Sequence, residues 1–409
     1  MTRLTHSARN AVMVKANNLR LLLITLMRRQ PISRVRLARE TGLSSTTVTN
    51  LVAELKERGI VAETGTDLEA VSEGAGRPPV ALRVVPSSAT ALGVHMGVRR
   101  VRVGLVDLQV NLLEHEVMEI DPAHSAEETL LRVAELCRRV LARRPDATAN
   151  GRLAGVGVGA SGLVEYGRGV NLYAPNLGWR NVPIQSILEQ ELGVPVAVDN
   201  NVRCMALAES LFGVGRNARA LAFIYARVGV GSGLVVDGDV YRGADNGAGE
   251  IGHWVTAARD GDLCSCGNRG CLETFLSELV LLQRADEVHP CLTHGRDNPL
   301  QFVFESARDG HLGLVEMLEE RAYYLGLALA NLVNVLNPEV IMLGGWFHEA
   351  FDLIEPVVVS TMRHHAFGGT GDGVRILPSS FGDFSGVAGA ATLALDSFFF
   401  TSDSVVAGK

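Results

Sequence analysis

A segment in the second half of the chain reads Glu250-Ile251-Gly252-His253 and, after ten further residues, Cys264-Ser265-Cys266-Gly267-Asn268-Arg269-Gly270-Cys271-Leu272-Glu273. Three of the chain's six cysteines fall within eight residues here. A Cys-x-Cys-x4-Cys run with one nearby histidine supplies the sulfur and nitrogen ligands that tetrahedral zinc prefers. Gly267 and Gly270 allow the tight turns that bring the thiolates together. The segment therefore predicts a zinc site of His253, Cys264, Cys266 and Cys271.

Two other interpretations of these cysteines remain open. A disulfide would leave one cysteine unpaired, and it needs an oxidising compartment, which nothing else in the chain suggests. Inert thiols without a metal are the second alternative. Four protein ligands leave no open position for a catalytic water, so a zinc ion here is expected to be structural.

The composition is that of an ordinary globular protein. The chain has 409 residues, of which 47% are hydrophobic and 20% are charged. This suggests two or three domains with large cores. The best N-terminal apolar run, Leu19 to Met27, is short and includes Arg20, unlike a signal peptide. No run approaches the roughly 18 uninterrupted apolar residues of a membrane span. We therefore expect a cytoplasmic protein that does not cross a membrane.

The charge is distributed unevenly along the chain. Residues 1–60 hold eleven Lys or Arg and three acidic residues, a net charge of +8 (11 minus 3). Since the whole chain carries −7, the remaining residues carry −15 (−7 minus 8). A basic head on an acidic body is the electrostatic footprint of a nucleic-acid-binding domain attached to something else. A solvated basic face is the alternative.

The head has the pattern of a helix-turn-helix. Apolar residues at helical spacing predict a first helix over 17–29, which Pro31 ends. Ser33 is a good N-cap for a second helix over 34–40. Gly42 then allows a tight turn into a third helix, which would enter the major groove of DNA.

The third helix is predicted from Ser44, its cap, through Lys56, and one face of it is polar. Hydroxyl and amide side chains gather on that face near the N-terminal half: Ser45, Thr46, Thr47, Thr49 and Asn50. With Ser44, these can bond to phosphates and base edges, while Arg34, Arg36 and Arg39 are placed for contacts to the DNA backbone.

A β-hairpin wing is predicted to follow, over 62–85. Its tip contains Gly74, Gly76 and Arg77, and Arg77 is placed to touch phosphate. A disordered linker is the alternative for the tip. Pro86-Ser87-Ser88 marks the expected domain boundary, so that residues 1–85 form a winged helix-turn-helix DNA-binding domain.

The rest of the chain predicts an α/β body of two successive glycine-rich halves. Strands are expected at 91–98, 101–106, 112–120, 155–162, 194–199, 221–225, 233–237 and 340–345, and helices at 126–143, 204–212 and 316–336. Such duplication suggests a cleft between lobes, where ligands usually bind. We expect the first lobe at 86–203, joined by a C-terminal helix at about 383–398, and the second at 204–382, with the zinc site and an oligomerisation surface.

These features resemble the ROK family (repressors, open reading frames, kinases), and within it the transcriptional regulators, such as xylose and N-acetylglucosamine repressors. The resemblance covers essentially the whole chain. Its most specific part is 229–273, where Gly249-Glu250-Ile251-Gly252-His253 precedes the cysteine run. It implies an actin/hexokinase-like (ribonuclease H-like) fold for the body, a structural zinc and a sugar site in the cleft.

Three stretches bear on whether such a body still phosphorylates sugar. Kinases of the family carry Asp-x-Gly-x-Thr for the ATP phosphates, whereas this chain has His95-Met96-Gly97-Val98-Arg99. Their Asn-Asp pair supplies the general base, whereas here Asp199-Asn200-Asn201 places an amide in that position. The second phosphate loop, usually Gly-Thr-Gly-x-Gly, begins here with Arg227 and Val228. Because loss of a general base alone lowers the rate by about 10²–10⁴, we expect sugar binding without enzyme activity.

The resemblance also implies which groups contact the sugar. Carried over by motif, Asn200, Glu250, His253 and Glu273 should hydrogen-bond sugar hydroxyls, with Asn176 and the backbone at Gly162 as further candidates. His253 would bind zinc through one ring nitrogen and sugar through the other. Two plainer interpretations stay open, Asn176 as a turn residue and Glu273 as a helix-start residue favoured by the helix dipole.

The sequence thus predicts a sugar-responsive DNA-binding regulator. Its expected action is to repress carbohydrate uptake or catabolism genes until a sugar or sugar phosphate releases it from operator DNA. A homodimer or homotetramer is expected, because an operator with two-fold character is matched by two heads. The competing interpretations are an active ATP-dependent sugar kinase with an appended head, and a sugar-independent protein controlled by a partner. ATP turnover with hexoses distinguishes the first, and titration with purified partners the second.

Overall fold

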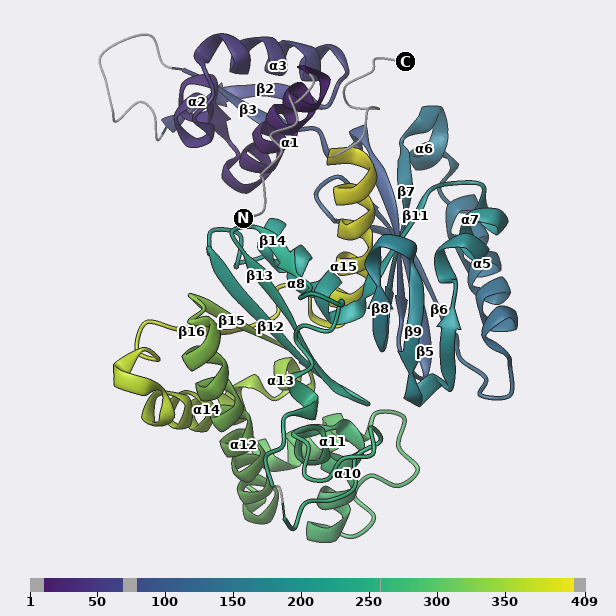
Figure 1. Ribbon diagram of the computed structural model, residues 1–409, viewed down its shortest axis with the longest axis vertical. Helices are drawn as coiled ribbons and strands as arrows, with labels where there is room; N and C mark the ends of the chain where they lie inside the picture. The colour runs from purple at the N-terminus through teal and green to yellow at the C-terminus, as the bar shows by residue number, and fades with distance from the viewer. Residues whose placement is uncertain (1–10, 69–78, 258, 401–409) are drawn as a thin grey trace, which may run out of the picture.

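A small head and a two-lobed body make up the structure, as Figure 1 shows. The computed structural model describes residues 11–68, 79–257 and 259–400. The head, drawn in purple, lies at one end of the body, close to the helix drawn in yellow near the C-terminus. Each lobe is built around its own sheet.

The helices of the head are α1 (Ala11–Arg29), α2 (Arg34–Thr41) and α3 (Ser45–Glu57). Ser33 caps α2 by accepting a hydrogen bond from the backbone N–H of Arg36. Ser44 caps α3 by accepting one from the backbone N–H of Thr47. Gly42 ends α2 at a φ of 69°, which a residue with a Cβ rarely adopts. The predicted caps and turn of the helix-turn-helix are therefore confirmed.

A three-stranded sheet completes the head. Its strands are β1 (Ile32–Ser33), β2 (Val61–Thr66) and β3 (Val80–Val84), in the order β1-β3-β2. The antiparallel pairing of β2 with β3 confirms the predicted wing. β1 escapes prediction because two residues are too few to show the period of a strand. The tip of the wing, including Arg77, lies outside the described residues.

The first lobe contains a five-stranded sheet in the order β11-β7-β4-β5-β6. Its strands are β4 (Thr90–Met96), β5 (Arg100–Asp107), β6 (Leu112–Glu119), β7 (Leu153–Ala160) and β11 (Val196–Asn200). β4, β5 and β6 form an antiparallel meander, whereas β7 pairs in parallel with β4 and β11. Helices α5 (Ala126–Ala142) and α7 (Ile184–Leu192) bury their apolar sides against one face.

Smaller elements extend this lobe. The short helix α6 (Pro145–Thr148) precedes β7. An antiparallel sheet of β8 (Leu163–Glu165), β9 (Val170–Ala174) and β10 (Trp179–Val182) follows it. The connection between β9 and β10 lines the cleft between the lobes.

The second lobe contains the other five-stranded sheet, in the order β14-β13-β12-β15-β16. Its strands are β12 (Ala220–Ala226), β13 (Val230–Val236), β14 (Asp239–Tyr241), β15 (Val340–Gly345) and β16 (Arg375–Pro378). Its helices are α9 (Glu273–Leu276), α10 (Glu278–Val288), α11 (Pro299–Arg308), α12 (Leu312–Leu336), α13 (Trp346–Glu349) and α14 (Phe351–His365). α12 and α14 share a large buried core with β12 and β15.

Two helices lie between the two sheets. They are α8 (Asn201–Leu211), which packs on the second sheet, and α15 (Ser385–Ala394), which packs on the first. A Cβ added to Gly157 of β7 would lie 1.8 Å from the carbonyl oxygen of Ala390, so glycine is needed for this approach. A Cβ added to Gly389 would lie 2.6 Å from the backbone of Cys204, so the two helices also touch. This order of layers is the expected two-lobed α/β body.

A buried helix connects the two lobes. The boundary expected between residues 203 and 204 falls near the start of this helix, α8. The expected C-terminal helix at 383–398 corresponds to α15 and to η8 (Leu395–Phe400), a π-helical stretch that continues it. Throughout 11–68, 79–257 and 259–400, no helix has the length and apolar character that a membrane crossing requires.

Candidate functional site

The four predicted zinc ligands converge in the second lobe. The ligand atoms of His253, Cys264, Cys266 and Cys271 all lie within 4.8 Å of one another. His253 ends the short helix η5 (Ile251–His253), and an isolated bridge pairs Val255 with Cys271 beside it. The four residues that the sequence predicts as ligands therefore lie together in the structure.

The chemistry of this cluster fits a metal ion and excludes a disulfide. All six cysteines are free, and the Sγ atoms of Cys266 and Cys271 lie 3.7 Å apart, whereas a disulfide bond measures about 2 Å. Burial, followed by hydrogen bonds with the neighbouring thiols, raises the pKa of the Cys271 thiol to about 12. A thiolate at Cys271 therefore needs a cation to offset its charge. A Cys3His set is compatible with structural zinc.

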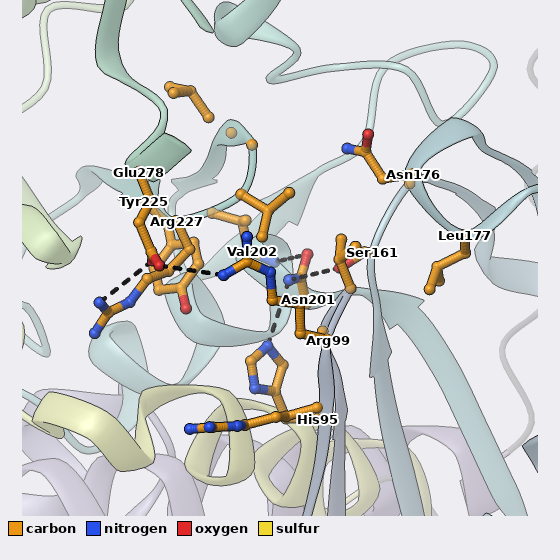
Figure 2. A pocket seen from close by; sticks show the side chains of 18 of the residues that line it. His95, Arg99, Ser161, Asn176, Leu177, Asn201, Val202, Tyr225, Arg227 and Glu278 are labelled. Atoms are coloured by element: carbon orange, nitrogen blue, oxygen red, sulfur yellow. Dashed lines mark hydrogen bonds and ion pairs between the residues drawn. The ribbon is translucent and has the colours of Figure 1, made fainter. Parts of the chain in front are cut away.

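A cavity of about 500 Å³ opens between the lobes beside this cluster, and Figure 2 shows it from close by. Its volume is that of a small-molecule site. Its lining includes every group predicted to contact sugar: Gly162, Asn176, Asn200, Glu250, His253 and Glu273. Because these groups come from both lobes, a ligand in the cavity would contact both.

Asn200 connects the cavity to α8. Its Oδ1 accepts the backbone N–H of Val202 at 2.9 Å and that of Arg203 at 3.2 Å, which caps the helix. Its Nδ2 donates to the carbonyl oxygen of Gly162 at 2.9 Å. Since an amide nitrogen carries two hydrogens, one donor remains for a ligand. Gly162 itself has a φ of 97°, and a Cβ there would lie 2.4 Å from the carbonyl oxygen of Tyr173.

Glu273 ties the zinc loop to the glycine-rich loop before β13. Its Oε2 accepts the backbone N–H of Val230 at 3.0 Å, and its Oε1 accepts the hydroxyl of Ser265 at 3.3 Å. Glu273 also begins α9, so the helix-start interpretation holds for its backbone. The side chain of Glu250 is exposed to the open cleft. The surrounding walls still desolvate it enough to raise the pKa of its carboxyl.

Asn176 lies on the opposite side of the cavity. It is in the short helical turn η4 (Pro175–Leu177), so the turn-residue interpretation is correct for its backbone. Its side chain is exposed and forms part of the cavity lining, as Figure 2 shows. The geometry is compatible with the predicted sugar contact.

His95 and Asn201, which replace the acids of the kinases, lie side by side. The Nδ2 of Asn201 is 3.5 Å from the Nε2 of His95 and 3.4 Å from the hydroxyl of Ser161 (Figure 2). His95 is buried, and this burial, followed by the charge of Arg102, lowers the pKa of its imidazole to about 3. The base position therefore contains a neutral amide beside a neutral ring.

Asp199, the remaining acid of this stretch, cannot act as a substitute base. One of its oxygens lies 3.1 Å from the Nη1 of Arg203, and the other 2.8 Å from Arg242. Its carboxylate is buried, and because each oxygen is paired with an arginine, neither can reach a substrate proton. Sequence reasoning missed both arginines: Arg203 is four residues from Asp199, whereas Arg242 is 43 residues away and its spacing gives no signal of the contact.

An ion-pair cluster occupies the position of the second phosphate loop. Arg227 contacts Glu349, Glu278 at 3.6 Å and Asp383 at 3.7 Å. Glu278 also lies 3.7 Å from the Nη1 of Arg99, from the stretch that replaces the first phosphate loop. The two loops that hold ATP phosphates in kinases are thus joined to one another through Glu278. The sequence marked Arg227 as a departure but could not show its partners.

The polar face of α3 is available to DNA. Ser44, Ser45, Thr46, Thr49 and Asn50 are exposed. Thr47 is partly buried, and its hydroxyl lies 2.9 Å from that of Ser44. Arg34 is at the surface, where it pairs with Glu63 at 2.9 Å.

Arg36 corrects the prediction for the head. Its Nη1 lies 3.0 Å from Oδ1 of Asp67, and both side chains are buried. Asp67 also accepts the backbone N–H of Ser33 at 2.7 Å. The predicted DNA-backbone contact of Arg36 is therefore wrong in this conformation, because its charge stabilises the inside of the head. The sequence did not show this, since Asp67 is far along the chain.

Comparisons with known proteins agree with this geometry. Residues 91–397 match the ROK family, and residues 17–62 match the winged helix-turn-helix DNA-binding family. A xylose repressor of Caldicellulosiruptor bescii is 32% identical over 84% of this chain and 87% of its own. A crystal structure of a ROK family transcriptional regulator, a homologue of the E. coli MLC protein, has a TM-score of 0.78 at 26% identity and covers 95% of this chain and 98% of its own. A ROK family glucokinase of Streptomyces griseus, solved with glucose and AMPPNP, has a TM-score of 0.65 at 28% identity and covers 75% of this chain and 100% of its own.

A winged helix-turn-helix on a kinase-like body with an altered base position defines a DNA-binding regulator rather than an enzyme. The chain belongs to the ROK family. The regulator structure covers 95% of the chain and the glucokinase 75%. The difference of 20% (95 minus 75) is about the size of the head, so head and body together match a regulator.

Proposed function

We propose that the chain represses genes of carbohydrate uptake or catabolism and is released from its operator by a sugar or sugar phosphate. The observation that carries this proposal is an intact winged head on a sugar-kinase body whose base position holds Asn201. The relatives named as a xylose repressor and a ROK family transcriptional regulator support it. Its place of action is the cytoplasm, where operator DNA lies.

The sugar binds in the cavity between the lobes. Asn200, Glu250, His253 and Glu273 supply most of its hydrogen bonds, and Asn176 and the backbone at Gly162 contribute from the first lobe. Carboxylates and amides suit this work because each can bond to two neighbouring hydroxyls. A ligand that contacts both lobes favours one lobe angle over others, and so shifts the population between them.

The Cys3His cluster holds a structural zinc ion that braces one wall of the sugar site. The Nδ1 of His253 lies 3.7 Å from the Sγ of Cys264, so Nδ1 faces the metal position. The Nε2 is then the ring nitrogen left for a sugar hydroxyl. Zinc also fixes the Cys271-Leu272-Glu273 turn relative to His253, which keeps Glu273 in place.

DNA binds to the exposed face of α3 and to the wing. Ser44, Ser45, Thr46, Thr47, Thr49 and Asn50 face the major groove, while Arg34 and, from the wing, Arg77 contact phosphates. A homodimer or homotetramer presents two heads to an operator with two-fold character. A coupling of about 1–3 kcal/mol between the sugar and DNA sites is enough for regulation.

Operator affinity across a panel of ligands tests this function. DNA selected from a random pool by the protein itself serves as the probe, at one fixed salt concentration. The panel contains neutral pentoses, hexoses and N-acetylhexosamines together with their phosphates. At least one should weaken DNA binding by about 5–150-fold. The inducer proposal fails if no ligand changes the affinity, and ATP turnover with the same sugars should stay at background.

A further inference from the structure

Helix α1 of the head contacts the body at two separate points. Near its middle, the Nη2 of Arg20 lies 2.7 Å from the Oδ1 of Asp396 in η8. Near its C-terminal end, the Nη2 of Arg28 lies 3.4 Å from the Oγ of Ser210 in α8. The two arginines are separated by about two helical turns.

The two contact points belong to different lobes. η8 packs on the first sheet, because a Cβ added to Gly155 in β7 would lie 2.5 Å from the ring of Phe398. α8 also touches α15, but it packs on the second sheet, because a Cβ added to Gly233 in β13 would lie 2.7 Å from the Cβ of Ala206. Arg28 also lies beside the turn after β13, where a Cβ on Gly238 would be 3.6 Å from its Nη2. Helix α1 therefore spans the division between the lobes.

Helix α8 runs from the sugar cavity to α1. Asn200, which caps it, and Asn201 line the cavity, and Ser210 near its other end contacts Arg28. The eleven residues of α8 span about 16 Å. All of them are buried, so α8 cannot bend into free space and should move as a rigid unit.

The contact between α1 and the body combines apolar side chains with two arginines whose hydrogen-bonding groups are not all paired. Leu22 and Leu26 of α1 belong to the same buried cluster as Leu207 and Leu211 of α8. In the described part of the chain, the Nε atoms of Arg20 and Arg28 are buried without a hydrogen-bond partner. Because unsatisfied buried donors are unfavourable, these two nitrogen atoms lower the stability of the contact and leave room for a different arrangement when the lobe angle changes.

The head has another attachment to the first lobe. The linker η1 (Pro86–Ser88) follows the wing, and the carbonyl oxygen of Pro86 accepts the backbone N–H of Leu108, just after β5, at 3.0 Å. The linker and Arg20 thus connect the head to the first lobe, whereas Arg28 connects it to the second. A rotation between the lobes would move one set of attachments relative to the other.

We propose that α1 senses the lobe angle through Arg20 and Arg28 and passes it to the DNA-reading helices. When sugar closes or opens the cleft, α8 shifts the Arg28 end of α1 while Arg20 and the linker keep the rest with the first lobe. The tilt of α1 reorients α2 and α3, which pack on it in the head core. This inference rests on the proposed function and names the route by which the cavity controls the head.

Substitutions on both sides of each contact test this route. Arg20→Met and Arg28→Met keep the apolar stems but remove the charged heads. Asp396→Asn and Ser210→Ala weaken the same contacts from the body side and leave the charges of the head unchanged. Lys56→Met is the matched control, because Lys56 pairs with Glu63 inside the head at 2.7 Å and this pair does not involve α1. Thermal unfolding confirms that each variant is folded.

The measured quantity is the ratio of operator Kd with and without the inducing sugar, at fixed salt. Loss of a basic residue can weaken DNA binding in both states, so the ratio rather than the affinity reports the coupling. For wild type a ratio of about 5–150 is expected. Arg28→Met and Ser210→Ala should bring it to within about twofold of unity, while sugar affinity without DNA stays within about twofold of wild type. Arg20→Met and Asp396→Asn should also lower the ratio of operator Kd values.

The outcomes are distinguishable. If the contact variants keep the wild-type ratio, α1 does not carry the signal, although the sugar-responsive function stands. If Lys56→Met lowers the ratio as much as Arg28→Met, the effect is one of charge and the proposed route is wrong. If wild type itself responds to no sugar, the proposed function fails, and this inference fails with it.

Discussion

The Nδ2 of Asn201 lies 3.5 Å from the Nε2 of His95, so the two residues that replace kinase acids contact each other. His95 is neutral because its pKa is lowered to about 3, chiefly by burial. Its Nε2 can therefore accept a hydrogen bond from the amide of Asn201. The two residues that depart from the kinase pattern thus form one neutral pair in the wall of the cavity.

Restoring the acid at position 201 should not restore a kinase. In Asn201→Asp the new carboxylate would raise the pKa of His95, because a nearby negative charge favours the imidazolium. ATP turnover should stay at background, because Arg99 and the Arg227 cluster still occupy both phosphate loops. A coupled assay with hexoses and ATP measures turnover, and NMR titration follows His95. Sugar-dependent turnover in the variant would show that the phosphate loops still work.

His95 should also make the body sensitive to acid. Its pKa is about 3 in the folded protein and 6.5 for an unperturbed histidine, so between these values the unfolded chain binds more protons. Stability therefore rises with pH in this window and is lost as the pH falls below about 6.5. At about 1.4 kcal/mol per pH unit, His95 should contribute a loss of about 2 kcal/mol between about pH 7 and pH 5.

The variant His95→Gln removes this titration and keeps a polar partner for Asn201. Urea unfolding of the body, followed at about pH 7 and pH 5, should show that the variant loses about 2 kcal/mol less than wild type. Equal losses in the two proteins would mean that His95 does not resist protonation in the folded state.

Removing a zinc ligand should loosen the sugar site. Cys266→Ser should lower the bound zinc far below that of wild type, as measured by elemental analysis of the purified protein. Under the proposed bracing of His253 and Glu273 by zinc, sugar affinity should fall at least about tenfold. Cys291→Ser is the control, since Cys291 is a free cysteine outside the cluster. Unchanged sugar affinity in a zinc-free protein would show that zinc does not stabilise the sugar site.

Arg36 and Arg34 should behave differently although they lie two residues apart. Arg36→Ala breaks a buried ion pair by removing the charge 3.0 Å from the carboxylate of Asp67, which should destabilise the head by about 3–5 kcal/mol. Arg34→Ala removes a surface pair and should change stability by less than about 1 kcal/mol. Thermal unfolding and operator binding of both variants check this. A stable Arg36→Ala head that has lost only DNA affinity would favour the original prediction of a phosphate contact.

Asn50 should contribute to operator specificity. It is exposed on α3, and an amide there can bond to an adenine edge in the major groove. Asn50→Ala should weaken binding to the selected operator by about 1–3 kcal/mol and leave binding to random DNA nearly unchanged. Glu57→Gln, at the far end of the same helix, is the control. Equal losses on both DNAs would assign Asn50 a role in phosphate contact instead.

Local patterns explain which parts of the fold could be predicted. Ser33, Gly42 and Ser44 act on backbone groups within a few residues of themselves, so caps and turns follow directly from the sequence. Buried strands such as β7 and β12 are continuous apolar runs. The Cys3His cluster could be predicted because three of its four residues lie in one short segment.

Long-range contacts explain what could not be predicted. Asp67 neutralises Arg36 from 31 residues away, and Arg242 reaches Asp199 across 43 residues. Neither partner has a distinguishing spacing in the sequence. The division between the lobes is hard to read from the sequence for a similar reason, because α8 is buried on every side and packs against both lobes.

The sequence by itself determined the parts of this protein: a basic winged head, two glycine-rich halves, a Cys3His set and a base position without an acid. These depend on residue type and on short spacings, which are visible along the chain. The tertiary structure alone decided how the parts act on one another. It placed His95 against Asn201, closed both phosphate loops on Glu278, and set α1 across the two lobes. Such relations arise when close packing brings distant segments together, and no local pattern encodes them.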